Sequence, residues 1–122
     1  LAGQPAASRF ALVDAAFVSC LQALRTRLGR PLLVTEGYRG PERHAAACEA
    51  TCTASPCEDL SCRAAPGDAP LTRGRAAFVS ASGAVDALIP HAAAAGFTGC
   101  RVEGGDLYVE WDFEAPRGCP AD

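Results

Sequence analysis

The order of the predicted elements indicates an α+β domain, in which a small, mostly antiparallel sheet packs against helices. Three observations lead to this fold class. An amphipathic helical segment lies near the N-terminus, two strand-like segments joined by glycines lie near the C-terminus, and a cysteine-rich stretch without apolar periodicity separates them. The 122 residues match the length of one domain. We expect 1–122 to form a single domain, with 1–7 as a loose leader, 49–70 as a Cys-rich loop and 114–122 as an irregular tail.

The first half of the chain is predicted to begin with a helix from Ser8 to Leu28. Apolar side chains recur there at spacings of three and four, which places them on one helical face: Phe10, Val13, Phe17, Cys20, Leu21, Leu24 and Leu28. Ser8 is expected to cap this helix and Gly29 to end it. Residues 32–35 then form an apolar run that predicts a strand, and a turn at 37–41 precedes a short helix over about 42–48.

The second half is predicted to alternate strands and one helix. A strand is expected over 76–80 and a helix over 83–95, with Pro90 as a kink or an early break. Two further strands are expected over 99–103 and 107–113. Gly104-Gly105-Asp106 lies between them and is typical of a hairpin connection.

The charge balance limits the possible partners. The net charge is -3, whereas nucleic acids and anionic membranes attract basic surfaces, so we expect neither as the main partner. No apolar run is long enough for a membrane span. The chain begins at Leu1 and contains no methionine, so we expect that its natural start, with a signal peptide or anchor, is not part of this sequence.

Seven cysteines indicate either an oxidising compartment or a metal site. Cys48, Cys52, Cys57 and Cys62 lack the C-x2-C spacing of zinc knuckles and fit neither common ferredoxin pattern, which favours disulfides; zinc held by these four thiolates is the alternative. Their spacing does not determine the connectivity. Cys100 and Cys119 are candidates for a bridge that holds the tail, and Cys20, on the apolar helix face, is the candidate free thiol. A secreted or periplasmic protein is expected.

Four short segments carry a resemblance to a known family. They are "LRTRLGRPLLVTEGYRGPE" from Leu24, "RGRAA" from Arg73, "AAGFTG" from Ala94 and "LYVEWDF" from Leu107. In this order and spacing they resemble the motifs of the zinc D-alanyl-D-alanine carboxypeptidases (peptidase M15-like) and their hedgehog-like relatives. The resemblance implies a hedgehog/DD-peptidase-like fold, in which the Cys-rich loop is an insertion.

The zinc ligands of that family are not present at the matching positions. The resemblance aligns the three ligand positions with Leu71, Phe78 and Glu110. A catalytic zinc needs about three protein ligands from His, Asp, Glu or Cys, and leucine and phenylalanine have no lone pair to offer. We therefore expect no zinc and no catalytic residue by the family mechanism, and interpret the chain as a non-catalytic relative.

The resemblance also implies a remnant cleft that binds cell-wall peptide or a protein partner. Its residues are Arg39, Tyr38, Glu110, Asp112, Leu71 and Phe78. In the family, the arginine of the Gly-Tyr-Arg turn is expected to bind the substrate carboxylate, which a guanidinium does without a metal. The plain alternative is that Arg39 braces the turn or pairs with an acid such as Glu42.

The sequence also gives predictions for two ionisable side chains near this cleft. Glu110 and Asp112 should share one strand face, and a desolvated Glu110 should have a raised pKa unless an arginine, Arg73 or Arg75, pairs with it. His44 is expected on a helix surface, with the cleft as the alternative location. Two other functions stay open: a metallopeptidase with relocated ligands, and a Cys-ligated metal or redox module.

Overall fold

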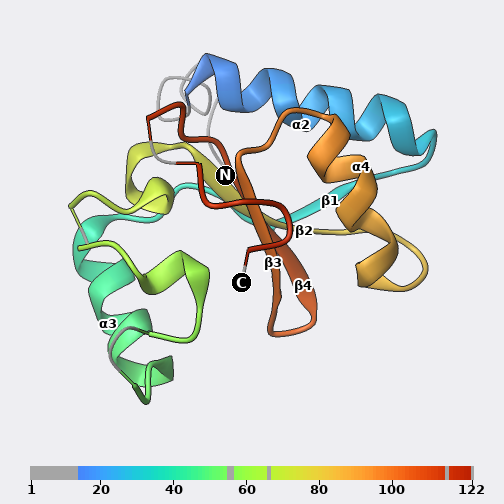
Figure 1. The fold of residues 1–122 in the computed structure, drawn as a ribbon. Coiled ribbons are helices and arrows are strands. Elements are labelled where there is room, and N and C mark those ends of the chain that lie inside the picture. The colour runs from blue at the N-terminus through green and yellow to red at the C-terminus, as the bar shows by residue number, and fades with distance from the viewer. Residues whose placement is uncertain (1–13, 55–56, 66, 115, 122) are drawn as a thin grey trace, which may run out of the picture.

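A four-stranded antiparallel sheet organises the chain in the computed structural model, which describes residues 14–54, 57–65, 67–114 and 116–121 (Figure 1). The strands are β1 (Leu33–Glu36), β2 (Ala76–Ser80), β3 (Gly99–Glu103) and β4 (Asp106–Glu110), in the order β1-β2-β4-β3. Helices lie on both faces of this sheet. The predicted α+β class with a small antiparallel sheet is confirmed.

The hairpin between β3 and β4 is tighter than predicted. Gly104 and Gly105 form the turn alone, with φ angles of 62° and 88° that suit glycine. Asp106 already belongs to β4 and pairs with Glu103. The prediction of a strand that continues to Phe113 is wrong, because β4 ends at Glu110.

Backbone hydrogen bonding continues past the end of β4, because Arg75 lies opposite Trp111 in the register of β2 and β4. The Trp111 N–H donates to the carbonyl of Arg75 at 2.8 Å, and the Asp112 N–H donates to the Thr98 hydroxyl at 2.6 Å. The expectation that Glu110 and Asp112 share one strand face is therefore wrong, since Asp112 is not in a strand.

The main core lies between the sheet and two helices, α2 (Ala15–Leu28) and α4 (Ile89–Ala94), which Figure 1 shows together on one side of the sheet. Asp14 caps α2 by accepting from the N–H groups of Ala16 and Phe17, and Gly29 ends it as predicted. The predicted cap, Ser8, lies outside the described residues. The buried side chains of this core are Phe17, Cys20, Leu24, Ala77, Val79, Leu88, Ala92, Phe97, Cys100, Leu107 and Val109.

The predicted helix over 83–95 is divided near Pro90, as expected. A 3-10 helix, η3 (Val85–Leu88), comes first, and α4 begins directly after it. Pro90 lies in the first turn of α4, where the missing N–H breaks no helical hydrogen bond.

The opposite face of the sheet is covered by α3 (Pro41–Thr51) and by two 3-10 helices, η1 (Leu60–Cys62) and η2 (Pro70–Arg73). Leu60 and Leu71 are fully buried there against Ala76 and Tyr108. The predicted loop over 49–70 thus begins inside α3 and docks onto the sheet through a buried leucine. Lacking helical or strand periodicity, its sequence did not indicate this buried surface.

Three disulfides cross-link the chain: Cys48–Cys62, Cys52–Cys57 and Cys100–Cys119. Cys20 is a buried free thiol. The predicted preference for disulfides, the Cys100–Cys119 pair and the free Cys20 are all confirmed. The third bridge holds the tail against β3, where Gly118 pairs in parallel with Gly99.

Among the described residues, no helix has the length and apolar character that crossing a membrane requires.

Replacing Leu60 with alanine tests the docking of the Cys-rich loop. Leu60 is 0% exposed, so Leu60→Ala should lower the free energy of unfolding by about 2–5 kcal/mol. Leu33→Ala is the matched control, because Leu33 is 62% exposed, and should change it by no more than about 0.5 kcal/mol. Chemical denaturation with the disulfides intact measures both. Equal effects for the two variants would contradict a docked loop.

Candidate functional site

The three positions that align with the family's zinc ligands lie on or against one sheet face. Ala76 pairs with Glu110 and Phe78 with Tyr108 across β2 and β4, so these side chains share the face opposite the main core. Leu71 is fully buried in the second cluster, and Phe78 packs against that cluster. Leu71, Phe78 and Glu110 offer only one carboxylate between them, so these residues do not fit the family's zinc ion.

Glu110 is fully buried and already has partners. The Tyr108 hydroxyl donates to its Oε1 at 2.7 Å, and Arg117 Nε lies 3.2 Å from its Oε2. Gly99 lies opposite on β3, where an added Cβ would come within 2.7 Å of Oε2. Glycine at position 99 therefore makes room for the buried carboxylate.

The predicted arginine partners of Glu110 are wrong. Arg117, from the tail that Cys119 holds in place, approaches Glu110 instead. Arg75 pairs with Asp14 at 3.4 Å and lies over the Trp111 ring, and Arg73 is exposed. The reason lies in the tertiary structure. The tail returns beside β3 and brings the guanidinium of Arg117 closer to Glu110 than those of Arg73 and Arg75, which precede β2.

Burial dominates the ionisation of this pair. It raises the pKa of Glu110, although the hydrogen bond from Tyr108 and the charge of Arg117 act in the opposite direction. Burial also raises the pKa of Tyr108 well above its usual value, and the adjacent Glu110 adds to this effect. The expected desolvated carboxylate is thus found, and the arginine near it does not offset the cost of burial.

Arg39 links β1 to α3 through charged contacts. It is 8% exposed, and its Nε and Nη2 donate to the two carboxylate oxygens of Glu36 at 2.8 and 2.7 Å. Its guanidinium also lies 5.9 Å from the centre of the Phe78 ring. Arg39 therefore pairs with an acid, as the plain alternative expected, and that acid is Glu36 instead of Glu42. The hydrogen bond from Arg39 is the main reason that the pKa of Glu36 is lowered.

His44 is buried, which corrects the expectation of a surface position. Its exposed fraction is 0%, because the Cys-rich loop covers the side of α3 that carries it. Arg39 Nη1 lies 3.0 Å from His44 Nδ1. Burial, followed by the charge of Arg39, lowers the pKa of His44. A neutral ring that accepts from Arg39 at Nδ1 carries its hydrogen on Nε2.

A pocket with a volume of about 150 Å³ opens between α3, η1 and the sheet. Arg39 and Phe78 line it, together with Ala47, Thr51, Asp59, Ser61, Cys62, Glu103 and Gly104. The other predicted cleft residues lie elsewhere. Leu71 and Glu110 are buried, and the half-buried Tyr38 and Asp112 are not among the lining residues.

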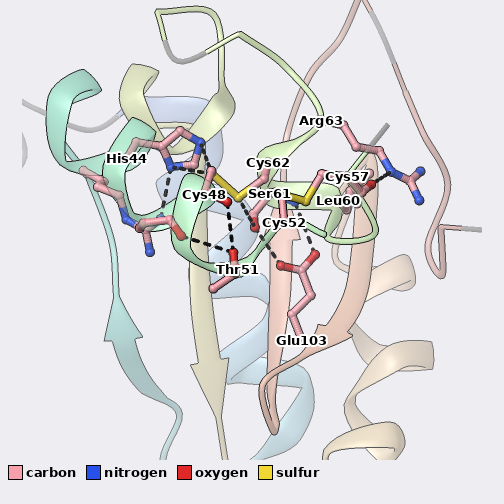
Figure 2. Close-up of a disulfide and its surroundings, with 12 residues drawn as sticks. His44, Cys48, Thr51, Cys52, Cys57, Leu60, Ser61, Cys62, Arg63 and Glu103 are labelled. Atoms are coloured by element: carbon pink, nitrogen blue, oxygen red, sulfur yellow. Dashed lines mark hydrogen bonds between the residues drawn. A yellow bond between two sulfur atoms is a disulfide. The ribbon is translucent and has the colours of Figure 1, made fainter. Parts of the chain in front are cut away.

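Two lining residues that the sequence did not single out form a buried pair. The Ser61 hydroxyl donates to Glu103 Oε1 at 2.7 Å, and the Ser61 N–H lies 3.2 Å from Oε2, as Figure 2 shows. Burial raises the pKa of Glu103, and the hydrogen bonds from Ser61 oppose this. No sequence signal joins these two residues, since they meet only when the Cys-rich loop docks on β3.

The sulfur atoms of the Cys-rich loop gather beside His44. Nε2 of His44 lies 3.4 Å from Cys48 Sγ, and ring nitrogen and sulfur atoms of His44, Cys48 and Cys62 lie within 4.8 Å of one another. The sulfurs of Cys52, Cys57 and Cys62 meet the same limit. Zinc binds thiolates, and these cysteines form disulfides, so the zinc alternative would require their reduction first. The four-residue spacing of His44 and Cys48 on a helix was the sequence signal for this contact.

Comparison with protein-family models, with curated proteins and with solved structures finds no match for this chain. The assignment to the carboxypeptidase family therefore stays a prediction from short motifs.

Glu110→Gln tests the raised pKa of the buried carboxyl. Between the ordinary value of 4.5 and the raised value, the folded protein binds more protons than the unfolded chain, so the free energy of unfolding falls as pH rises through this interval. One group gives a slope of at most about 1.4 kcal/mol per pH unit. The Glu110→Gln variant has no ionisable group at this position. The free energy of unfolding of the wild type relative to the variant should therefore decrease as pH rises above 4.5.

Denaturant titrations across this pH range measure the difference. Glu114→Gln, which removes an exposed carboxylate from the adjacent segment, is the control. If the wild type instead gains stability relative to Glu110→Gln on going from acid to neutral pH, the direction given for Glu110 is wrong.

Proposed function

We propose that this protein is a non-catalytic relative of cell-wall D,D-carboxypeptidases with a hedgehog/DD-peptidase-like fold, and that it binds the carboxyl end of a cell-wall peptide. One observation carries the proposal. Arg39 aligns with the family's substrate-binding arginine and Phe78 with a zinc ligand, and both line the same pocket. The resemblance requires these two segments to meet at one cleft.

The absence of catalysis in this proposal rests on the residues at the aligned positions. Leu71 and Phe78 pack in an apolar cluster, and the buried carboxyl group of Glu110 accepts a hydrogen bond from Tyr108 and forms an ion pair with Arg117. Family catalysis needs a metal that polarises a carbonyl and acidifies water. These side chains provide neither a ligand set for such a metal nor another Lewis acid.

The pocket suits the end of a peptide better than a whole small molecule. Its volume of about 150 Å³ is below the roughly 300–1,000 Å³ of usual small-molecule sites. Contacts with described residues use three of the five N–H groups of Arg39. A terminal carboxylate would meet the remaining donors, and Asp59 at the same pocket would accept from a peptide N–H.

The disulfides support a secreted or periplasmic location for this function. Such bridges persist in oxidising compartments, and three of them in a chain of 122 residues indicate one. A periplasmic or secreted domain meets cell-wall peptides there.

A pocket-filling variant tests peptide binding. Ala47 lines the pocket and Ala46 is an exposed neighbour on the same helix, so Ala47→Leu and Ala46→Leu form a matched pair. We expect a short peptide ending in D-Ala-D-Ala to shift the NMR signals of pocket residues. Ala47→Leu should weaken binding at least tenfold, since the added side chain occupies the pocket, and Ala46→Leu should leave it unchanged.

An amide-capped version of the peptide tests the role of the carboxylate. It should bind more weakly than the free acid, because it removes the charge that Arg39 would recognise. If neither peptide shifts any signal, Arg39 serves only to brace the turn through Glu36, and the binding proposal is rejected.

Restoring the ligands tests the alignment itself. The triple variant Leu71→His, Phe78→Asp and Glu110→His should bind about one zinc ion per chain, because it would supply three ligands on one face. Elemental analysis after dialysis, with the disulfides oxidised and the wild type as control, measures this. A variant that keeps the circular dichroism spectrum of the wild type and binds no zinc would show that the aligned positions are wrong.

A further inference from the structure

Two disulfides lie close together where α3 ends. Cys48–Cys62 joins the last turns of α3 to η1, and Cys52–Cys57 closes a short loop directly after α3 (Figure 2). The sulfur of Cys62 lies within 4.8 Å of the sulfurs of Cys52 and Cys57. Disulfide exchange needs a thiolate that can reach a disulfide sulfur, and this arrangement places two cysteines within reach of Cys62 once their own bridge is opened.

Among the described contacts, Cys48 is the cysteine whose sulfur lies within hydrogen-bond range of a histidine ring. Glu36 orients Arg39 through two hydrogen bonds, and Arg39 lies 3.0 Å from His44 Nδ1. This contact leaves the hydrogen of the neutral ring on Nε2, which lies 3.4 Å from Cys48 Sγ, and the ring also hydrogen-bonds the backbone of Ser61. A thiolate formed at Cys48 would therefore accept a hydrogen bond from His44 and lie near the positive charge of Arg39.

We propose that these two disulfides form a thiol–disulfide relay, in which Cys52–Cys57 takes electrons from an external dithiol and passes them to Cys48–Cys62, releasing the thiol of Cys48. This activity is independent of peptide binding. Its substrate class is a dithiol, either a small molecule or a reduced pair of cysteines on a protein partner.

The first step opens the Cys52–Cys57 disulfide. Cys52 is half-buried and Cys57 is 8% exposed, so the external thiolate attacks the sulfur of Cys52 and Cys57 leaves as a thiolate. The second thiol of the dithiol then loses its proton, attacks its own partner sulfur and forms a cyclic disulfide. Cys52 leaves and takes up a proton. The dithiol has lost two electrons and the protein has gained two.

The second step opens the Cys48–Cys62 disulfide. The Cys57 thiolate attacks the sulfur of Cys62, a Cys57–Cys62 disulfide forms, and the bond between Cys62 and Cys48 breaks. Cys48 leaves with the electron pair and later takes up a proton. Attack on Cys62 is favoured over attack on Cys48 because the better stabilised thiolate leaves faster, and among the described contacts the His44 ring lies within hydrogen-bond range of the Cys48 sulfur.

Disulfide mapping after limited reduction tests the relay on the intact protein. One molar equivalent of dithiothreitol is added at neutral pH, thiols are alkylated, and the bridges are identified by peptide mass spectrometry. We expect alkylated Cys48 and Cys52, with a new Cys57–Cys62 bridge. Cys100–Cys119 is the internal control and should stay intact, since Cys100 is buried in the main core. Alkylation of Cys52 and Cys57 alone, or equal loss of all three bridges, would overturn the proposal.

Rates separate a relay from independent reduction. In Cys52→Ser with Cys57→Ser, the Cys48–Cys62 bridge should be reduced at least tenfold more slowly than in the wild type, because its route for electrons is gone. Unchanged reduction of Cys48–Cys62 in this variant would reject the relay. Should the variant fail to fold, the mapping on the wild-type protein decides.

His44 is a positioning residue in this scheme, and a pair of variants tests it. His44→Phe removes the donor, and release of Cys48 should slow about tenfold. His44→Gln keeps an N–H near the position of Nε2 and should restore most of the rate. A merely structural role would instead make both variants differ from the wild type in stability without separating them in the rate of Cys48 release.

Discussion

The contact that the rest of the structure depends on is the docking of the Cys-rich loop onto the sheet face opposite the main core. Leu60 supplies the apolar part of this contact and Ser61 the polar part, since Ser61 bonds to Glu103 through both its hydroxyl and its N–H. Cys48–Cys62 ties the same short segment to α3. A segment without strand or helix periodicity is thus held by one leucine, one buried hydrogen-bonded pair and one covalent bridge.

This docking buries several ionisable groups. His44 is buried by the loop, and Glu103 by Ser61 and its neighbours. The loop also meets the tail, because Arg117 Nη1 donates to the carbonyl of Leu60 while Arg117 Nε approaches Glu110. The tail, the Cys-rich loop and the end of β4 therefore form one connected polar layer. Its hydrogen bonds limit the cost of removing charged groups from water, although burial still dominates the pKa of both Glu103 and Glu110.

The pocket and the disulfides belong to the same small region. Cys62 and Ser61 line the pocket that Arg39 and Phe78 also line, and Arg39 contacts the histidine beside Cys48. Opening the Cys48–Cys62 bridge would free η1 from α3, and these two elements form two walls of the pocket. The Cys48–Cys62 bridge therefore links the redox state of these cysteines to the shape of the pocket.

The sequence by itself determined the local features of this protein. The spacing of Phe17, Cys20 and Leu24 indicated the buried face of α2, and the glycines at 104 and 105 indicated the hairpin. These predictions hold because helical and strand periodicity and glycine turns depend on neighbouring residues. The motifs also selected Arg39 and Phe78, which share the pocket.

Only the tertiary structure decided which distant residues meet. The Ser61–Glu103 pair, the partner of Glu110, the burial of His44 and the pairing of four closely spaced cysteines all depend on how the Cys-rich loop and the tail return to the sheet. No local pattern encodes such contacts, because each joins segments whose approach is set by the packing of the whole chain.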